Sequence, residues 1–169
     1  MAGYNHGVIE IRRIQPHEAA AVKRVIYRVA HEIFHDPRPL EESILYHESR
    51  GELRDMDDIQ QNYFENGGIF LVTLDEDQII GTGAIRALKD DICELKRLWL
   101  LTGYHGRGLG YRMIQELFSF AREKGYARIW LQTDAMDQSR ALDFYKRLGF
   151  REIPRYTERT DDIALELEL

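Results

Sequence analysis

The spacing of apolar side chains along this sequence predicts an α/β protein built on one sheet. Three stretches place apolar residues at the three-to-four-residue spacing of amphipathic helices: 16–34, 109–124 and 138–148. Seven shorter stretches have the alternation or the compact apolar run of strands: 8–14, 69–74, 78–88, 93–101, 127–133, 150–153 and 163–169. This order predicts a mixed, mostly antiparallel sheet of about seven strands, with helices on both of its faces.

The connection 38–68 is the least regular part of the pattern and is rich in acidic residues. Asp55 is a suitable N-cap for a helix over 56–65, with Asp58 in the first turn of that helix. A further helical turn is expected over 43–49.

Three alternating glycines, Gly106, Gly108 and Gly110, separate a predicted strand from a predicted helix. Glycine lets the backbone come close to a ligand and adopt a positive φ at little cost, and the first amides of a helix attract anions. Arg107 adds a cation to the loop. We therefore expect a phosphate-binding loop, and the alternative is a tight turn that needs glycine for its geometry alone.

The loop lacks the spacing of two common nucleotide-binding motifs, because G-x-G-x-x-G fails at its third glycine and no G-K-[ST] follows. The segment 105–110 (HGRGLG) instead resembles motif A of the GNAT N-acetyltransferase superfamily, [QR]-x-x-G-x-[GA], with His105 in place of Gln or Arg. The segment 138–150 is similar to the N-x-x-A-x-x-x-Y-x-x-x-G-F of that family, with Gln138 in place of Asn. The resemblance covers 69–169 well and the N-terminal part in layout only.

The resemblance implies a GNAT fold in a single domain, 1–169, with acetyl-CoA as cosubstrate and no metal. The pyrophosphate is expected at the glycine loop and the pantetheine arm along the end of the preceding strand, where an amide near Leu100 would bind the oxyanion. The implied cofactor-binding residues are Leu100, Leu101, Thr102, His105, Gly106, Arg107, Gly108, Leu109, Gly110, Tyr111, Gln138 and Tyr145.

The resemblance also implies direct acetyl transfer to an amine through a tetrahedral intermediate, with two candidate catalytic residues. Glu94 aligns with a catalytic glutamate of some family members and is the candidate base; the alternative is a surface ion pair with Lys96 or Arg97. Strand alternation places Glu94 on the same side as Leu100 unless a bulge intervenes. Tyr145 aligns with the family tyrosine and is the candidate acid for the leaving thiolate; the alternative is a core tyrosine.

Composition limits the classes of function. The chain has 169 residues, of which 44% are apolar and 31% charged, which suits one domain. No apolar run approaches a membrane span, and the N-terminus lacks the apolar segment of a signal peptide. The net charge of −6 argues against nucleic acid as a partner. The single cysteine, Cys93, fits a reducing cytoplasm, and we expect it to be a buried structural thiol.

The expected acceptor is a small molecule with a primary amine. In the layout that the resemblance implies, the connection 38–68 and the loop 154–162 border the acceptor groove. Their carboxylates favour an amine with a second positive charge if they line that groove, and are otherwise a solvated surface. Arg155 and Arg159 favour an acceptor carboxylate instead. The oligomeric state stays open, a homodimer included.

Two other functions are alternatives. One is a module that binds acetyl-CoA without catalysis, as a sensor or scaffold. The other is a zinc hydrolase, because the segment 31–35 (HEIFH) spells H-E-x-x-H, in which His31 and His35 would bind the metal and Glu32 would act as base. Pro37 breaks the helix directly after this motif, which favours an ordinary solvated helix end.

Overall fold

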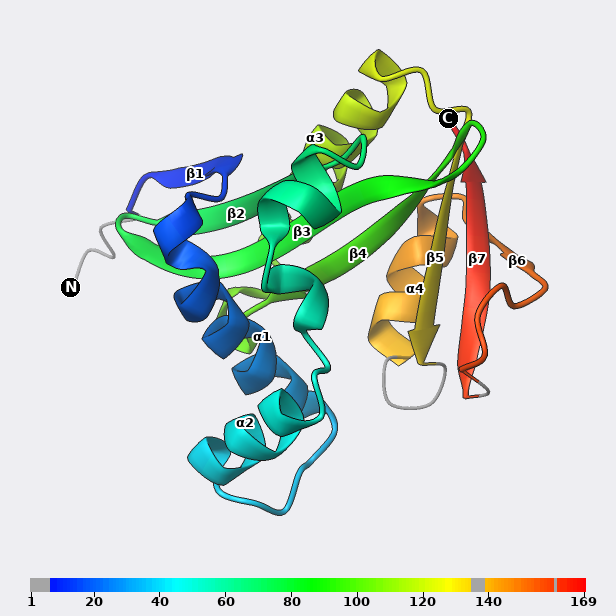
Figure 1. Ribbon diagram of the computed structural model, residues 1–169. Helices are drawn as coiled ribbons and strands as arrows, with labels where there is room; N and C mark the ends of the chain where they lie inside the picture. Colours follow the sequence, from blue (N-terminus) through cyan, green and yellow to red (C-terminus); the bar gives the residue numbers. More distant parts are fainter. Residues whose placement is uncertain (1–6, 135–138, 160) are drawn as a thin grey trace.

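The computed structural model describes residues 7–134, 139–159 and 161–169. Within them, seven strands form one sheet in the spatial order β1-β2-β3-β4-β5-β7-β6 (Figure 1). Neighbouring strands are antiparallel except β4 and β5, which are parallel. The strands are β1 Ile9–Arg13, β2 Ile69–Asp75, β3 Gln78–Lys89, β4 Ile92–Leu100, β5 Arg128–Asp134, β6 Arg151–Ile153 and β7 Asp162–Glu168. The predicted mixed, mostly antiparallel sheet is confirmed.

Helices cover both faces of this sheet, as predicted (Figure 1). The α-helices of the described residues are α1 Ala19–Ile33, α2 Leu40–Ser49, α3 Leu109–Glu123 and α4 Ser139–Arg147. Strand β2 shows how the faces divide, because its side chains alternate between two cores. Phe70 packs in the core that contains Val22 of α1, whereas Leu71 packs with Leu117 of α3. Helix α4 adds Tyr145 to the core on the α3 face. No helix in the described part of the chain is long and apolar enough to cross a membrane.

Strands β4 and β5 pair over only a short part of their length. Residues 92–94 pair with residues 128–130, and beyond them the two strands diverge (Figure 1). Strand β5 keeps its pairing with β7 from end to end. The divergence therefore leaves the second half of β4 without a strand partner on one side and opens the sheet next to the glycine loop.

A β-bulge lies in this second half of β4. Between Lys96 and Trp99, β4 has one residue more than the facing part of β3. Arg97 lies inside the bulge and has a left-handed φ of 57°. The expectation that Glu94 and Leu100 share one side of the strand is wrong, because the extra residue reverses the alternation.

The connection between α1 and β2 also differs from its prediction. Helix α2 begins at Leu40 and is a full helix rather than a single turn over 43–49. In place of one helix over 56–65, the chain forms a 3-10 helix at Arg54–Met56 and a π-helix at Gln60–Phe64. Two further 3-10 helices, Pro16–Glu18 and Thr102–Tyr104, precede α1 and the glycine loop.

Asp55 does not cap a helix, because its carboxylate is used in contacts with distant residues. It accepts hydrogen bonds from Arg97 Nε at 3.1 Å and from the Tyr63 hydroxyl. Asp58 accepts a hydrogen bond from the Gln61 amide at 2.9 Å instead. A guanidinium of β4 thus outweighs the local capping preference of Asp55.

Candidate functional site

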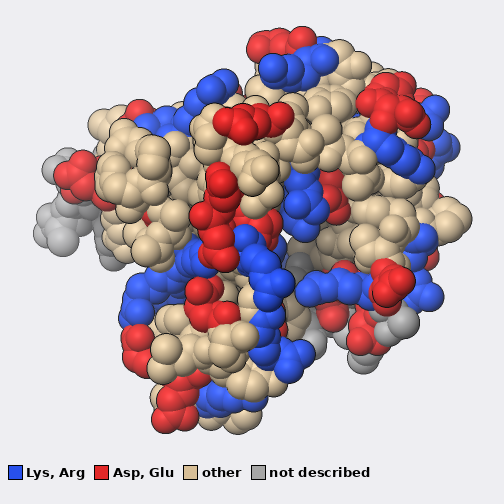
Figure 2. All heavy atoms as spheres, viewed as in Figure 1, with Lys and Arg blue, Asp and Glu red and all other residues tan. Residues whose placement is uncertain are grey.

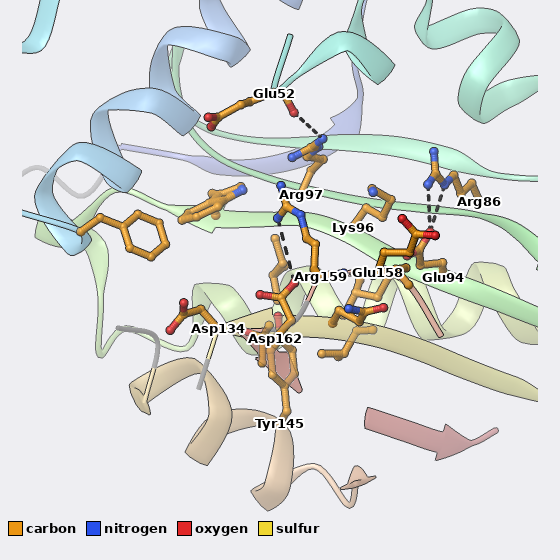
Figure 3. Close-up of a pocket in the computed structure, with 18 residues that line it drawn as sticks. Glu52, Arg86, Glu94, Lys96, Arg97, Asp134, Tyr145, Glu158, Arg159 and Asp162 are labelled. Atoms are coloured by element: carbon orange, nitrogen blue, oxygen red, sulfur yellow. Dashed lines mark hydrogen bonds and ion pairs between the residues drawn. The ribbon is translucent and has the colours of Figure 1, made fainter. Parts of the chain in front are cut away.

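The point at which β4 and β5 diverge opens into a cavity of about 670 Å³ (Figure 3). Figure 2 shows this face of the molecule hollowed between the α1–α2 side and the β5–β7 side, with basic side chains around the hollow. The charged residues of the lining are Glu52, Arg86, Glu94, Lys96, Arg97, Asp134, Glu158, Arg159 and Asp162. A cavity of this size with convergent polar groups is typical of a small-molecule site.

Glu94, the candidate base, lines this cavity and is only 7% exposed. Its Oε2 accepts a hydrogen bond from Arg86 Nε at 3.1 Å, and its Oε1 accepts one from the Tyr156 hydroxyl at 3.1 Å. Arg86, and not Lys96 or Arg97, is therefore its ion-pair partner. These two hydrogen bonds hold both carboxylate oxygens of Glu94 in one orientation at the cavity.

Tyr156 is a site residue that the sequence analysis missed. It lies in the loop between β6 and β7, and its ring packs against Trp130 with 5.1 Å between the centroids. Burial raises the pKa of Tyr156 far above its ordinary value, and the charge of Glu94 acts in the same direction. Tyr156 is therefore a protonated donor. Tyr156 lies in a loop of charged and polar residues that has no regular spacing of apolar positions. Its contact with Glu94 is therefore visible only in the folded structure.

Tyr145, the candidate acid, lines the same cavity from α4 (Figure 3). Its ring packs against Phe150, with 5.5 Å between the centroids, and the residue is 7% exposed. Burial raises the pKa of Tyr145 well above its ordinary range. Its hydroxyl forms no hydrogen bond with the residues that the structure describes, so this donor is available to a bound molecule. The fold thus brings Glu94 and Tyr145 to one cavity, and Tyr145 is also a core residue.

The glycine loop has the backbone geometry of an anion site. Gly106 and Gly108 have φ of 76° and 75°, and Gly108 is the N-cap of α3. The first hydrogen bond of α3 joins the Arg112 amide to the Gly108 carbonyl at 3.0 Å. The amides of the three residues between them, Leu109, Gly110 and Tyr111, have no acceptor within the helix. Three helix-end donors at the open edge of β4 fit a pyrophosphate.

Arg107 lies on the surface of this loop. Its Nη2 donates to the Gly103 carbonyl at 3.2 Å, and its guanidinium lies 5.0 Å from the centroid of the Tyr104 ring. These contacts keep a positive charge beside the glycines. Tyr104 is itself held by Asp75, whose carboxylate accepts from its hydroxyl at 2.8 Å.

The end of β4 connects to the loop through His105. Its Nε2 lies 2.9 Å from the Leu100 carbonyl, so the side chain of His105, and not only its backbone, shapes this turn. The Leu101 amide donates to the Ile80 carbonyl at 2.9 Å, and the Thr102 hydroxyl donates to Glu32 at 2.8 Å. The main chain of Leu101 is therefore already engaged with β3. Gln138 lies outside the residues that the structure describes.

Most carboxylates of the acidic connection face away from the cavity. Four of them are ion-paired with other parts of the chain: Glu41 with Arg24, Glu48 and Asp57 with Lys23, and Asp55 with Arg97. Of this connection, only Glu52 is part of the cavity lining. In the second bordering loop, Asp162 and Arg159 line the cavity, whereas Arg155 is not part of the lining.

The H-E-x-x-H segment does not adopt the geometry of a zinc site. Helix α1 ends at Ile33, and His35 has a left-handed φ of 50° beyond that end. His31 Nε2 lies 2.7 Å from the Arg38 carbonyl. The described residues contain no group of three or more His, Cys, Asp or Glu side chains arranged to hold a metal ion.

Cys93 is fully buried, and its Sγ donates to the Arg128 carbonyl at 3.6 Å. Burial raises the pKa of Cys93 to about 12. At neutral pH this thiol stays protonated and is a poor nucleophile.

Comparison with known proteins agrees with this architecture. A sequence model described as the acetyltransferase (GNAT) family matches residues 28–150. The Escherichia coli protein named uncharacterized N-acetyltransferase YjgM is 32% identical over 117 residues, which are 68% of this chain and 70% of that protein. The chain spans about half the length of the mammalian relatives that it matches.

Two solved structures show the same fold. A GNAT-family acetyltransferase from Staphylococcus aureus superposes with a TM-score of 0.82 at 21% identity, covering 95% of this chain and 99% of that one. The PaiA N-acetyltransferase from Thermoplasma acidophilum, solved in complex with coenzyme A, superposes with a TM-score of 0.77 at 20% identity, covering 96% and 99%.

Proposed function

We infer the reaction of this protein from its family: the chain belongs to the acetyltransferase (GNAT) family and is an acetyl-CoA-dependent acyltransferase. We propose that it transfers the acetyl group directly to the primary amine of a small molecule bound in the cavity beside β4. The observation that carries this proposal is that Glu94 and Tyr145 line one cavity at the open edge of β4.

In this proposal, acetyl-CoA binds along the divergence of β4 and β5 and supplies the acetyl thioester. The amides of Leu109, Gly110 and Tyr111 and the backbone of Gly106 and Gly108 hold the pyrophosphate, with Arg107 adding charge and His105 supporting the turn. The free edge of β4 near Leu100, with Leu101 and Thr102 after it, accompanies the pantetheine arm, and an amide there stabilises the oxyanion. The contact proposed between Gln138 and acetyl-CoA rests on the family resemblance alone.

In this proposal the chain supplies both a base and an acid for the reaction. Glu94 takes the proton that the ammonium of the acceptor must lose before it can attack, directly or through a water. Arg86 and Tyr156 hold the carboxylate in place for this step. Tyr145 donates its proton to the thiolate that leaves. Its hydroxyl suits this step because it is protonated and forms no hydrogen bond with the residues that the structure describes.

The experiment that tests this proposal measures release of free CoA thiol with a panel of small primary amines. Wild-type protein is expected to acetylate at least one class of these amines. Glu94→Gln keeps the size of the side chain but cannot take a proton, so we expect kcat/KM to fall by about a hundredfold or more.

Calorimetry with acetyl-CoA is the control, and Glu94→Gln should bind it as wild type does. If the variant acetylates amines at the wild-type rate across the pH range, Glu94 is not the base. If no amine gives thiol release with wild-type protein, the proposed transfer to a small molecule is wrong.

A further inference from the structure

Four cations line the cavity, and their partners differ. Three are ion-paired with carboxylates of the described residues: Arg86 with Glu94 at 3.1 Å, Arg97 with Asp55, and Arg159 with Asp162 at 4.0 Å. Lys96 forms no hydrogen bond or ion pair with any residue that the structure describes. In the described part of the chain, Lys96 is therefore the cation of the cavity lining that has no ion-pair partner.

Lys96 is also partly buried. Its ammonium loses hydration without gaining a partner in return, which is unfavourable in free energy. Figure 3 shows its side chain between Arg97 and the pair formed by Arg86 and Glu94. Burial lowers the pKa of Lys96, and the positive charges of Arg86 and Arg97 add to that effect against the attraction of Glu94. A cation held in such a place is better explained by a ligand than by stability.

None of the described carboxylates of the cavity lining forms an ion pair with Lys96. Glu52 lies 2.8 Å from His47. Glu94 and Asp162 are paired with arginines, and Asp134 has an interaction of its own. Glu158 has no ion pair among the described residues, but it is exposed at the edge of the cavity, where water and salt screen it. The ammonium of Lys96 is therefore open to a ligand, although the lining as a whole has five carboxylates and four cations.

We propose that Lys96 binds a carboxylate of the acceptor, so that the acceptor is an amino acid or an amino carboxylate of similar size. This inference rests on the proposed function, since Glu94 must receive the amine of the same molecule. Glu94 and Lys96 are two residues apart on β4, so their Cα atoms are about 7 Å apart. A compact molecule with both an amine and a carboxylate can reach both side chains.

The chemistry of Lys96 favours one carboxylate over a more highly charged group. A single ammonium offers three donors and one positive charge, which one carboxylate neutralises. Arg159 lies on the opposite loop with a long ion pair and an exposed side chain, so it can move to add a second donor. The doubly cationic amine expected from the acidic connection gains little support from this cavity, because only Glu52 of that connection is part of the lining.

The test compares each amino acid with its carboxamide, which keeps the side chain and the amine but lacks the negative charge. The two amines differ in basicity, so the quantity measured is the acid-to-amide ratio of kcat/KM in wild type and in Lys96→Met. We expect that ratio to fall about ten- to a hundredfold in the variant, as for loss of a charged hydrogen bond. Lys96→Arg keeps the charge and should restore part of the ratio.

Lys124→Met is the matched control, since Lys124 is exposed at the far end of α3 and should leave the ratio unchanged. Thermal unfolding and acetyl-CoA calorimetry show whether Lys96→Met is folded and binds its cosubstrate. An equal loss on acids and amides would make Lys96 part of the catalytic step and overturn this inference. A wild-type preference for diamines over amino acids would overturn it too, while leaving the proposed function in place. No thiol release with any amine would overturn both.

Discussion

At the scale of single residues, the site combines core packing with chemistry. Tyr145 packs its ring against Phe144 and Phe150 and presents its hydroxyl to the cavity. The core and the acid interpretations of this tyrosine are therefore compatible, since a buried ring holds the hydroxyl in one place. Glu94 is likewise held by two donors, Arg86 and Tyr156. Side chains that are held in this way suit the proton transfers proposed for them.

Removing the Tyr145 hydroxyl tests its role without disturbing the core. Tyr145→Phe keeps the ring and its contacts, so we expect the melting temperature and the affinity for acetyl-CoA to stay close to wild type. The turnover number kcat is expected to fall about ten- to a thousandfold, because the leaving thiolate loses its proton donor. Steady-state thiol-release kinetics measure kcat, and an unchanged value would leave Tyr145 with a packing role alone.

At the scale of elements, the bulge in β4 is tied to the connection between α1 and β2. Arg97 at the bulge donates to the carboxylate of Asp55 and, at 3.2 Å, to the Glu52 carbonyl. Burial disfavours the ionised form of Asp55, but the hydrogen bond and charge of Arg97 outweigh it and lower the pKa of Asp55. This ion pair joins the 3-10 helix Arg54–Met56 to the strand that carries Glu94 and Lys96.

Asp55→Asn removes one charge of this ion pair, whose side chains are 18% and 13% exposed. We expect the free energy of unfolding to fall by about 2–4 kcal/mol, since Arg97 keeps a poorly solvated charge. Because the pKa of Asp55 is lower in the folded state, its stabilisation is complete above the unfolded pKa of about 3.9 and is lost as the pH falls through the lower folded pKa. Denaturant unfolding at several pH values should show the difference from wild type shrinking below about pH 4.

Asp58→Asn is the matched control for Asp55→Asn. Among the described residues, the side chain of Asp58 accepts one local hydrogen bond, from the Gln61 amide, and Asn serves as well as Asp in that place. Its effect on the unfolding free energy should stay below about 0.5 kcal/mol. Equal effects of the two substitutions would mean that the pair with Arg97 does not stabilise the fold.

At the scale of the whole molecule, the sheet is two antiparallel units joined by a short parallel contact. β1–β4 form one unit and β5–β7 the other, and residues 92–94 with 128–130 are the link between them. The cavity and the glycine loop both lie at the open side of this link. A cosubstrate bound there would contact both units and so stabilise the molecule against unfolding.

Acetyl-CoA is therefore expected to raise the melting temperature. At about a hundredfold excess over Kd, binding adds about 2.7 kcal/mol to stability, which for a domain of this size corresponds to a shift of about 5–10 °C. Differential scanning fluorimetry measures the shift, with NAD at the same concentration as a control that should give none. A larger shift with NAD would contradict the assignment of the glycine loop to acetyl-CoA.

The sequence by itself determined the order of the seven strands, the glycine loop before α3, and the places of Glu94 on β4 and Tyr145 on α4. These features depend on local properties: apolar periodicity, the φ preference of glycine, and motif spacing within one or two adjacent elements. They could be predicted because each is encoded within about thirty residues.

Only the tertiary structure decided the partners of the charged residues. Glu94 binds Tyr156, 62 residues away, and Arg97 binds Asp55, 42 residues away. Neither pairing has a local signal, because which carboxylate meets which cation depends on segments that fold beside each other from distant parts of the chain. The β4 bulge and the lack of an ion pair for Lys96 among the described residues likewise became visible only in the folded chain.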